Sequence, residues 1–367
     1  MSTPTSTSTS TSTSVTFATS YEIQVRKELA KEHNFRYVGI PTSKNTVRVL
    51  DKKGNWKLID LDGKPLTKNV VYLTAFSEGR AKVQETLDAY HQYFIDETGD
   101  RIDSTSLQIC RDSYFSEGLA SARDKTNRKG YINKQGQLAI ACLFQQVTEF
   151  SDSVAWVRYP LPSPMGNLFY LIDKTGNKVL EQPFLGVNNF VNGVAGVQIP
   201  KLNFNGKRSS LETYGCYYVI IDKNGNQLSQ NKFPYIEEFV GDVAIAYGQD
   251  NRQIFINKYG EQTSKNSYEG LGVISDGICS LPLVDQNKAY YIDTKENQIS
   301  DVYDEVNPFS EGVGCVKNKG QYFFIDRNGK EVFSEYFDKA NSFDEGVALV
   351  QKGQQVFYID HTGEKVF

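Results

Sequence analysis

One pattern of apolar and polar positions recurs from Leu58 to the end of the chain. Each copy has an aromatic and β-branched run, then Ile-Asp or Ile-Asn, two polar residues, a Gly and a second apolar run, as at residues 321–333. An Asp at the start of a tight turn accepts backbone hydrogen bonds, and a Gly three residues later supplies the positive φ that closes the turn. The pattern therefore predicts β-hairpins.

The turn Asp or Asn occurs nine times, and consecutive copies are 33 to 49 residues apart. The nine positions are Asp60, Asp96, Asn133, Asp173, Asp222, Asn257, Asp293, Asp326 and Asp360. A near-constant period of this length indicates a repeat architecture. Gly follows three residues later in every copy except the one at Asp293, where Glu296 stands in its place. We expect a longer or distorted turn in that copy.

A second motif, Phe-x-Glu-Gly or a close variant of it, lies between successive hairpins. It occurs at residues 76–79, 115–118, 190–193, 309–312 and 343–346, with weaker copies at 150–153 and 239–242. Its glutamates are predicted to lie at a repeated surface turn or to link neighbouring units by hydrogen bonds, with an acidic binding ring as the alternative. They are Glu78, Glu117, Glu311 and Glu345. The run after each motif is rich in Gly and Ala, which predicts an innermost strand that another backbone approaches closely.

Together the two motifs resemble the bacterial WG-repeat (KWG-repeat) family. The closest match is Gly-Tyr-Ile-Asn-Lys-Gln-Gly at residues 130–136, and the resemblance extends over about residues 46–367. The Trp that names the family is retained at Trp56, while the other copies have Tyr or Phe at this aromatic position. The resemblance implies a β-repeat module and brings no catalytic residues with it.

The pattern predicts an all-β repeat protein, and we favour a β-propeller of eight or nine four-stranded blades. Residues 35–40 resemble the run that closes other units, such as residues 336–343, and the last unit lacks such a run. The N-terminal strand is therefore predicted to complete the last unit and close the ring, which leaves no open sheet edge. The alternative is an open β-solenoid or superhelix of hairpin repeats, which tolerates any number of units.

The composition and pattern of residues divide the chain into three predicted segments. Residues 1–19 are almost all Ser and Thr and are predicted to be a disordered tail. Residues 20–44 hold a predicted helix at 21–33, with Val25 and Leu29 on one face, and the closing strand; the helix is expected to cover an end of the array. Residues 45–367 form the repeat array. Two units carry insertions, at 159–167 and 199–215, which are either ornament or binding loops.

Charge, hydropathy and cysteine content indicate which partners and which cell compartment to expect. The net charge of −4 gives no basic footprint for nucleic acid or an anionic membrane. Neither an apolar run of membrane-spanning length nor a secretory signal is present, so we expect a cytoplasmic protein without membrane insertion. The five Cys residues have no CxxC spacing and are interpreted as buried structural thiols in a reducing compartment.

The sequence offers no candidate catalytic, cofactor-binding or metal-ligating residues. The three His residues, His33, His91 and His361, show neither metal-ligand spacing nor a nucleophile partner. Motifs for nucleotide binding, zinc proteases and α/β-hydrolases are absent. We therefore predict a non-enzymatic protein-binding or scaffold module whose partner is another protein. The alternatives are an enzyme with its site at one mouth of a propeller, or a glycan or small-ligand binder, which the excess of Tyr and Phe suggests.

Overall fold

The computed structural model describes residues 20–87, 92–102, 107–162, 167–200 and 215–366. The tail predicted to be disordered, residues 1–19, lies outside the described residues. So do residues 163–166 and 201–214, which make up much of the two insertions.

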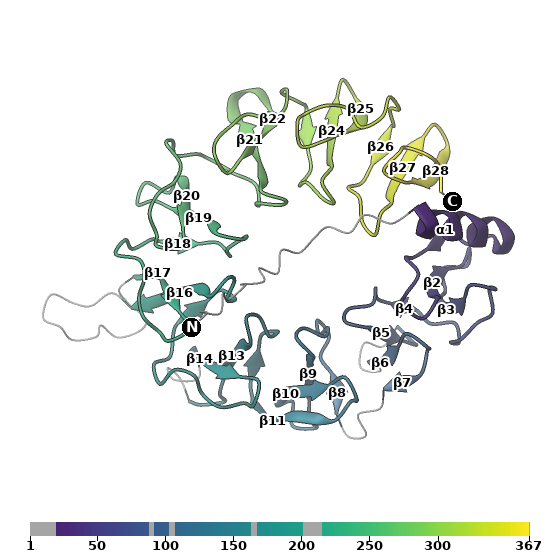
Figure 1. Cartoon of the computed structure of the whole chain (residues 1–367). Coiled ribbons are helices and arrows are strands. Elements are labelled where there is room, and N and C mark those ends of the chain that lie inside the picture. Colours follow the sequence, from purple (N-terminus) through teal and green to yellow (C-terminus); the bar gives the residue numbers. More distant parts are fainter. Residues whose placement is uncertain (1–19, 88–91, 103–106, 163–166, 201–214, 367) are drawn as a thin grey trace, which may run out of the picture.

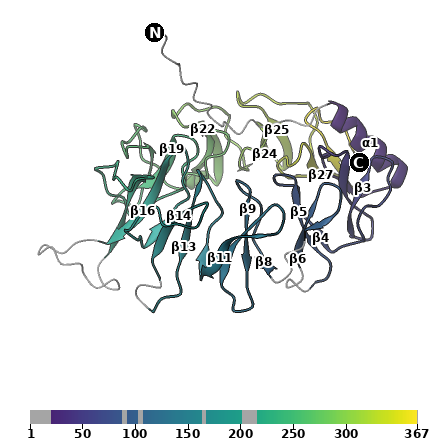
Figure 2. The same ribbon diagram turned by 60° about the horizontal axis from the view of Figure 1, so that its bottom comes forward.

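Nine antiparallel sheets follow one another around a ring, and the first and the ninth meet beside the single α-helix of the described residues (Figure 1). Figure 2 shows the sheets standing side by side around this ring. The protein is therefore an all-β propeller, as predicted. The alternative of an open solenoid is wrong, because side chains of the first sheet contact the ninth sheet directly.

Strands at the same position of each sheet are similar in length and have the same role. The first is a two-residue strand in eight sheets: β1 Tyr37–Val38, β4 Tyr72–Leu73, β8 Gln108–Ile109, β12 Gln146–Val147, β15 Gly186–Val187, β18 Tyr235–Ile236, β23 Glu305–Val306 and β26 Lys339–Ala340. The second is longer: β2 Thr46–Leu50, β5 Arg80–Gln84, β9 Leu119–Arg123, β13 Val154–Arg158, β16 Val194–Pro200, β19 Val243–Tyr247, β21 Ile278–Leu283, β24 Gly314–Asn318 and β27 Ala348–Lys352. The third leads into the Asp turn: β3 Trp56–Asp60, β6 Gln92–Asp96, β10 Lys129–Asn133, β14 Phe169–Asp173, β17 Cys216–Asp222, β20 Gln253–Asn257, β22 Lys288–Asp293, β25 Gln321–Ile325 and β28 Gln355–Ile359.

In the described part of the chain, two sheets have a regular fourth strand: β7 (Arg101–Ile102) and β11 (Leu138–Phe144). In most of the others isolated bridges hold the outer position, as Phe337 does opposite Tyr322. The sheet of β21 and β22 has two strands, and a hydrogen bond from Gly272 N to Ser280 O (2.9 Å) marks the place of its first strand. Most units therefore have four strand positions, as predicted, but the fourth position is usually held by isolated bridges and not by a regular strand.

The Gly- and Ala-rich run is the second strand of each sheet, so its prediction as the innermost strand was wrong. In the eighth sheet the strand order β23-β24-β25 places it between two paired neighbours. Its small residues are needed because adjacent sheets pack on both of its faces, and four of the five residues of β9 are buried. A Cβ at Gly314 would lie only 2.7 Å from the Phe309 ring.

The N-terminal strand opens the first sheet and does not complete the last one. β1 pairs with β2 in antiparallel register, with Tyr37 opposite Leu50 and Val38 opposite Val49. Residues 336–343, which residues 35–40 resemble, contain β26, the first strand of the ninth sheet. The resemblance was therefore sound, but such a run begins a sheet rather than ending one. For this reason the prediction of closure by strand exchange was wrong.

Helix α1 (Ser20–His33) covers the first sheet, as predicted. Val25, Leu29 and Ala30 are buried against Val38, Val47, Val49 and Ile59 of that sheet. The helix lies where the two ends of the ring meet (Figure 1), so it is placed to contact both the first and the ninth sheet.

The hydrophobic core is divided among the junctions between neighbouring sheets. Eight junctions hold clusters of six to ten buried apolar residues. The ninth junction, between the ninth and the first sheet, holds three: Tyr37, Val347 and Val366. We call this junction the seam. Because apolar burial is smallest there, polar contacts must supply more of its stability.

All nine Asp and Asn residues form the predicted type of tight turn, including the one at Asp293. In each, one side-chain oxygen of the Asp or Asn accepts hydrogen bonds from the N–H groups two and four residues later. The distorted turn expected at Asp293 was wrong, because Glu296 takes the glycine conformation with φ of 68° and donates its N–H to Asp293 O (3.0 Å). Its carboxylate accepts hydrogen bonds from the N–H groups of Lys265 and Asn266 in the preceding sheet, which offsets the backbone strain.

Candidate functional site

The Phe-x-Glu-Gly motif forms a two-residue β-hairpin turn. Ser77 and Arg80 exchange both backbone hydrogen bonds, at 2.8 and 3.0 Å, while Glu78 and Gly79 have φ of 51° and 76°. Two central residues with positive φ define a type I′ turn, which suits Gly but strains Glu. Because this conformation is strained for Glu, contacts of its side chain must stabilise it.

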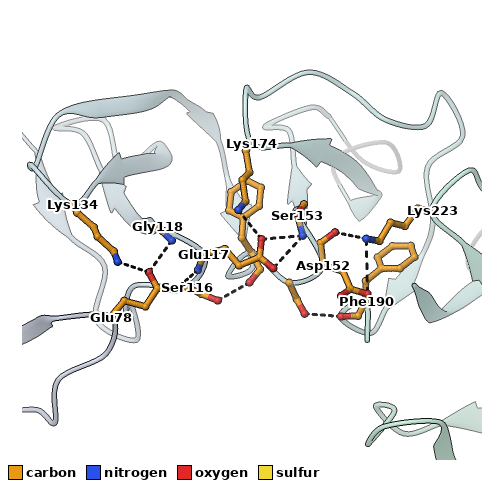
Figure 3. A network of polar contacts seen from close by, with 12 residues as sticks. Glu78, Ser116, Glu117, Gly118, Lys134, Asp152, Ser153, Lys174, Phe190 and Lys223 are labelled. Atoms are coloured by element: carbon orange, nitrogen blue, oxygen red, sulfur yellow. Dashed lines mark hydrogen bonds and ion pairs between the residues drawn. The ribbon is translucent and has the colours of Figure 1, made fainter. Parts of the chain in front are cut away.

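The carboxylate of one sheet binds the equivalent turn of the next sheet (Figure 3). Glu78 accepts hydrogen bonds from the N–H groups of Glu117 (2.6 Å) and Gly118 (2.9 Å) and pairs with Lys134 (3.0 Å). Glu117 in turn binds Ser153 N (2.9 Å) and Lys174 (2.9 Å). The cation in each case directly follows the turn Asp or Asn of the next sheet.

We call these contacts the carboxylate latches, and they recur at five of the nine junctions within the described residues. Their acids are Glu78, Glu117, Asp152, Asp276 and Glu311. A sixth acid, Glu345, forms a variant latch in which its carboxylate binds Arg48 and Tyr37 of the next sheet in place of a turn N–H. A serine strengthens several of them, since Ser116 Oγ donates to Phe150 O (2.7 Å) and Ser151 Oγ to Phe190 O (2.5 Å). The prediction that the glutamates link neighbouring units is confirmed.

One latch acid was not predicted from the sequence, and a second lies in a motif that was counted only as a weaker copy. Asp276 lies in Ile-Ser-Asp-Gly, which lacks the expected Phe, and Asp152 lies in a motif that lacks the Gly. Asp276 nevertheless accepts a hydrogen bond from Gly312 N (2.8 Å) and lies 3.4 Å from Arg327. A pattern in the sequence could have revealed Asp276. In several units an acid of this motif is matched by a cation that directly follows the turn Asp or Asn of the next unit, as Arg327 follows Asp326. Because the acids already have partners, an open acidic binding ring is not favoured.

A second polar cluster spans the second, third and fourth sheets. Lys82 on β5 is buried and its Nζ donates to Arg111 O, and Ser121 on β9 donates to a Glu149 oxygen at 3.2 Å. Burial raises the pKa of Glu149 to about 7, and the Ser121 hydrogen bond and the charge of Lys82 offset this only in part. Burial likewise lowers the pKa of Lys82.

The raised pKa of Glu149 predicts a pH-dependent stability. An acid whose pKa is higher in the folded state than in the unfolded state stabilises the fold at low pH, and this stability is lost as the pH rises through the folded pKa. Between pH 5 and 8 the wild type should therefore lose about 1–3 kcal/mol relative to Glu149→Gln. Urea unfolding of both proteins across this range measures the difference. Parallel pH profiles would contradict the assignment.

The His and Cys residues, which are suited to other chemistry, are dispersed over the ring. His33 lies against Gly63, and His361 stacks on Phe343 with centroids 4.1 Å apart while facing the latch acid Glu311 at 3.3 Å. His91 lies outside the described residues. Cys110, Cys279 and Cys315 are buried and Cys142 and Cys216 are partly buried, all as free thiols. The described residues contain no cluster of His, Cys, Asp and Glu suited to a metal and no helix both long and apolar enough to cross a bilayer.

The seam is closed by buried charge. Arg26 of α1 is fully buried and donates to Val38 O (2.8 Å) in the first sheet and to Glu345 O (2.6 Å) in the ninth. Arg48 of β2 pairs with the Glu345 carboxylate at 2.6 Å, and the Tyr37 hydroxyl donates to the same carboxylate. The latch at this junction thus uses cations from the N-terminal residues in place of the usual turn Lys.

Two hollows flank this closure. An inner pocket of about 440 Å³ is lined by Tyr37, Trp56 and Tyr358, with the Arg48 guanidinium 5.2 Å from the Tyr37 ring and 4.9 Å from the Trp56 ring. A larger groove of about 720 Å³, which we call the seam groove, lies between α1, the first sheet and strand β28. Among the described residues, five cations and no Asp or Glu line it. The cations are Lys27, Lys31, Arg36, Lys52 and Lys365.

The two insertions follow the second strands of the fourth and fifth sheets. Residues 159–167 join β13 to β14. Residues 199–215 include the last two residues of β16 and the link from it to β17, so each insertion connects the second and third strands of its sheet. The latch turns lie at the opposite ends of these strands. Whether the insertions bind a ligand stays a prediction, since residues 163–166 and 201–214 lie outside the described residues.

Three segments match the family model of the WG containing repeat: residues 130–159, 291–322 and 322–355. They make up less than half of the chain. Each begins within the third strand of one sheet and runs through the second strand of the next, so the family repeat is offset from the sheets. The resemblance found in the sequence is therefore confirmed for these copies.

Comparison with curated proteins gives no match. Solved structures similar to this chain include the computationally designed protein Ika8, with 13% identity over 80% of this chain and 97% of that chain and a TM-score of 0.40. BamB from Moraxella catarrhalis has 9% identity over 88% and 95%, with a TM-score of 0.37. The C-terminal WD40 domain of Sif2 has 12% identity over 86% and 92%, with a TM-score of 0.37. At these TM-scores the assignment of the fold rests on the nine sheets of the ring itself.

Proposed function

We propose that this chain is a non-enzymatic protein-binding module and that the seam groove is its binding surface. The observation that carries the proposal is the charge of the groove: five cations line it, while no Asp or Glu among the described residues does. Lys31, Arg36 and Lys52 form no ion pair within the described part of the chain. A one-signed concave surface beside apolar side chains favours a complementary partner.

The rest of the ring supports a scaffold role. The carboxylate latches and the junction cores fix each sheet on its neighbours, so the groove is presented by a rigid frame. Within this proposal all nine sheets are copies of the WG-type repeat, and the protein acts in a bacterial cytoplasm. The exposed tyrosines do not favour a glycan binder, because within the described residues only Tyr72 and Tyr235 share a position in the unit.

Site-directed photo-crosslinking in the native cell tests the proposal. A photo-reactive amino acid replaces Lys52 in one variant and Lys330 in the other, since Lys330 is an exposed lysine away from the groove. We expect discrete protein adducts at position 52 and none of the same mass at position 330. Equal adduct patterns at the two positions, or no adduct at position 52, would contradict a protein-binding groove.

A further inference from the structure

We propose that the inner pocket binds a small organic cation with an aromatic body. The inference goes beyond the protein-binding role of the seam groove and does not depend on it.

The inner pocket lies where the ninth, first and second sheets meet. Tyr358 of β28, Trp56 of β3 and Tyr72 of β4 line it from these three sheets. Its volume of about 440 Å³ lies within the usual range for sites that hold small molecules. Among the described residues the seam holds three buried apolar side chains, where the other junctions hold six to ten, so space for a ligand is left there.

Aromatic rings form much of the pocket wall. Tyr37, Trp56, Tyr72 and Tyr358 all line it, and Tyr72 is 50% exposed, so its ring is accessible from solvent. The rings of Tyr37 and Trp56 already lie close to a cation, the Arg48 guanidinium. The face of an aromatic ring attracts a cation, so this wall suits a cationic ligand as well as an apolar one.

Asp344 departs from the repeat at a position where five other sheets have Ser. Each of these serines donates a hydrogen bond to a Phe carbonyl of the next sheet. They are Ser77, Ser116, Ser151, Ser275 and Ser310. An ionised carboxylate has no hydrogen to donate, so Asp344 cannot make this contact. It lines the inner pocket instead and takes part in no ion pair among the described residues.

The charge of Asp344 is only partly balanced by its surroundings. Arg48 pairs with the Glu345 carboxylate at 2.6 Å, so the charge of Arg48 is already matched. Partial burial raises the pKa of Asp344, the charge of Glu345 raises it further, and the charge of Arg48 offsets these effects only in part. A cation beside Asp344 would therefore stabilise its carboxylate, whereas an anionic ligand would face two acids.

A ligand that joins an ammonium group to an aromatic ring fits both features of the pocket. The ammonium donates a charge-assisted hydrogen bond to Asp344, and the ring packs against Trp56 and Tyr72. Asn341 and Ser342 also line the pocket and offer further acceptors to the ammonium hydrogens.

Fluorine NMR of a small ligand titrated with the full chain tests the inference. The probe is para-fluorophenethylamine. The comparison compound is para-fluorophenethyl alcohol, which keeps the ring and loses the charge. We expect the amine to bind, and to bind at least about tenfold more tightly than the alcohol. No binding of the amine, or equal affinity for the two compounds, would overturn the inference.

Variants locate the binding. Asp344→Asn removes the charge and keeps the shape, so it should lower the affinity for the amine about tenfold and leave the affinity for the alcohol unchanged. Asp344→Ser, which restores the residue of the other sheets, should have the same effect. Tyr72→Ala should weaken the binding of both compounds. The control is Asp62→Asn, since Asp62 is an exposed acid of the first sheet outside the pocket, and this variant should bind like the wild type.

Urea unfolding checks that each variant is folded. Should Asp344→Asn fail to fold, Asp344→Ser and Tyr72→Ala provide the same test. Equal amine affinity in the wild type and the Asp344 variants, or an equal loss with Asp62→Asn, would place the compound elsewhere and overturn the inference.

The outcomes separate this inference from the proposed function. Amine binding without adducts at position 52 would keep the cation site in the inner pocket and refute the protein-binding groove. Adducts at position 52 without amine binding would keep the groove and refute the cation site.

Discussion

Gly329→Val should destabilise the protein by about 2–6 kcal/mol, since two penalties of about 1–3 kcal/mol each apply at this position. Gly329 has φ of 75°, a conformation in which a β-branched side chain is strained. A Cβ at this position would also lie 2.1 Å from Ile299 O in the preceding sheet. That neighbour is backbone and cannot turn away, so the substitution must push two sheets apart.

Lys330→Val is the matched control for this prediction. Lys330 is exposed and follows Gly329 directly, so its substitution changes a surface side chain in the same turn. We expect a change within about 0.5 kcal/mol, the usual range for surface substitutions. Urea unfolding measures both values. Similar midpoints for the two variants would contradict the assignment of the turn.

Arg26→Met should destabilise the fold by about 2–5 kcal/mol, because it leaves buried acceptors without their donor. Arg26 donates to one carbonyl in the first sheet and one in the ninth, and it is fully buried. The junction it crosses has only three buried apolar residues to hold it. Methionine preserves most of the apolar stem, so the loss reports on the guanidinium.

Lys31→Met on the same helix is the control, since Lys31 is exposed. We expect this variant to stay within about 0.5 kcal/mol of the wild type in urea unfolding. A loss for Lys31→Met equal to that for Arg26→Met would show that α1 matters as a helix and not through its buried arginine.

The turns and the number of sheets could be predicted from the sequence because they depend on local chemistry. Asp326 accepts bonds from residues two and four positions later, so the turn is encoded within five residues. The same holds for the other eight copies, which explains why nine turns yielded nine sheets. The helix was also predictable, since Val25 and Leu29 show its buried face.

Features that depend on contacts between sheets were harder to predict from the sequence. Glu296 takes the conformation of glycine because the preceding sheet holds its carboxylate, and nothing in its own turn indicates this. Strand β1 was predicted correctly, but it was assigned to the last sheet and not to the first. The sequence repeat does not show at which strand each sheet begins, so either assignment fitted the pattern. The seam groove joins residues more than 300 positions apart, such as Lys31 and Val356, so no local pattern could reveal its charge.

Ring closure through the N-terminal residues is tested most directly by hydrogen exchange in Arg26→Met. The substitution should speed amide exchange in β2, which belongs to the first sheet. Amides of β27 and β28 lie more than 300 residues from the substitution, and we expect their exchange rates to rise by at least the same factor. Amides of β16 and β17, across the ring from the seam (Figure 1), should accelerate less. Faster exchange confined to α1, β1, β2 and β3, with β27 and β28 no faster than β16 and β17, would contradict a closed ring.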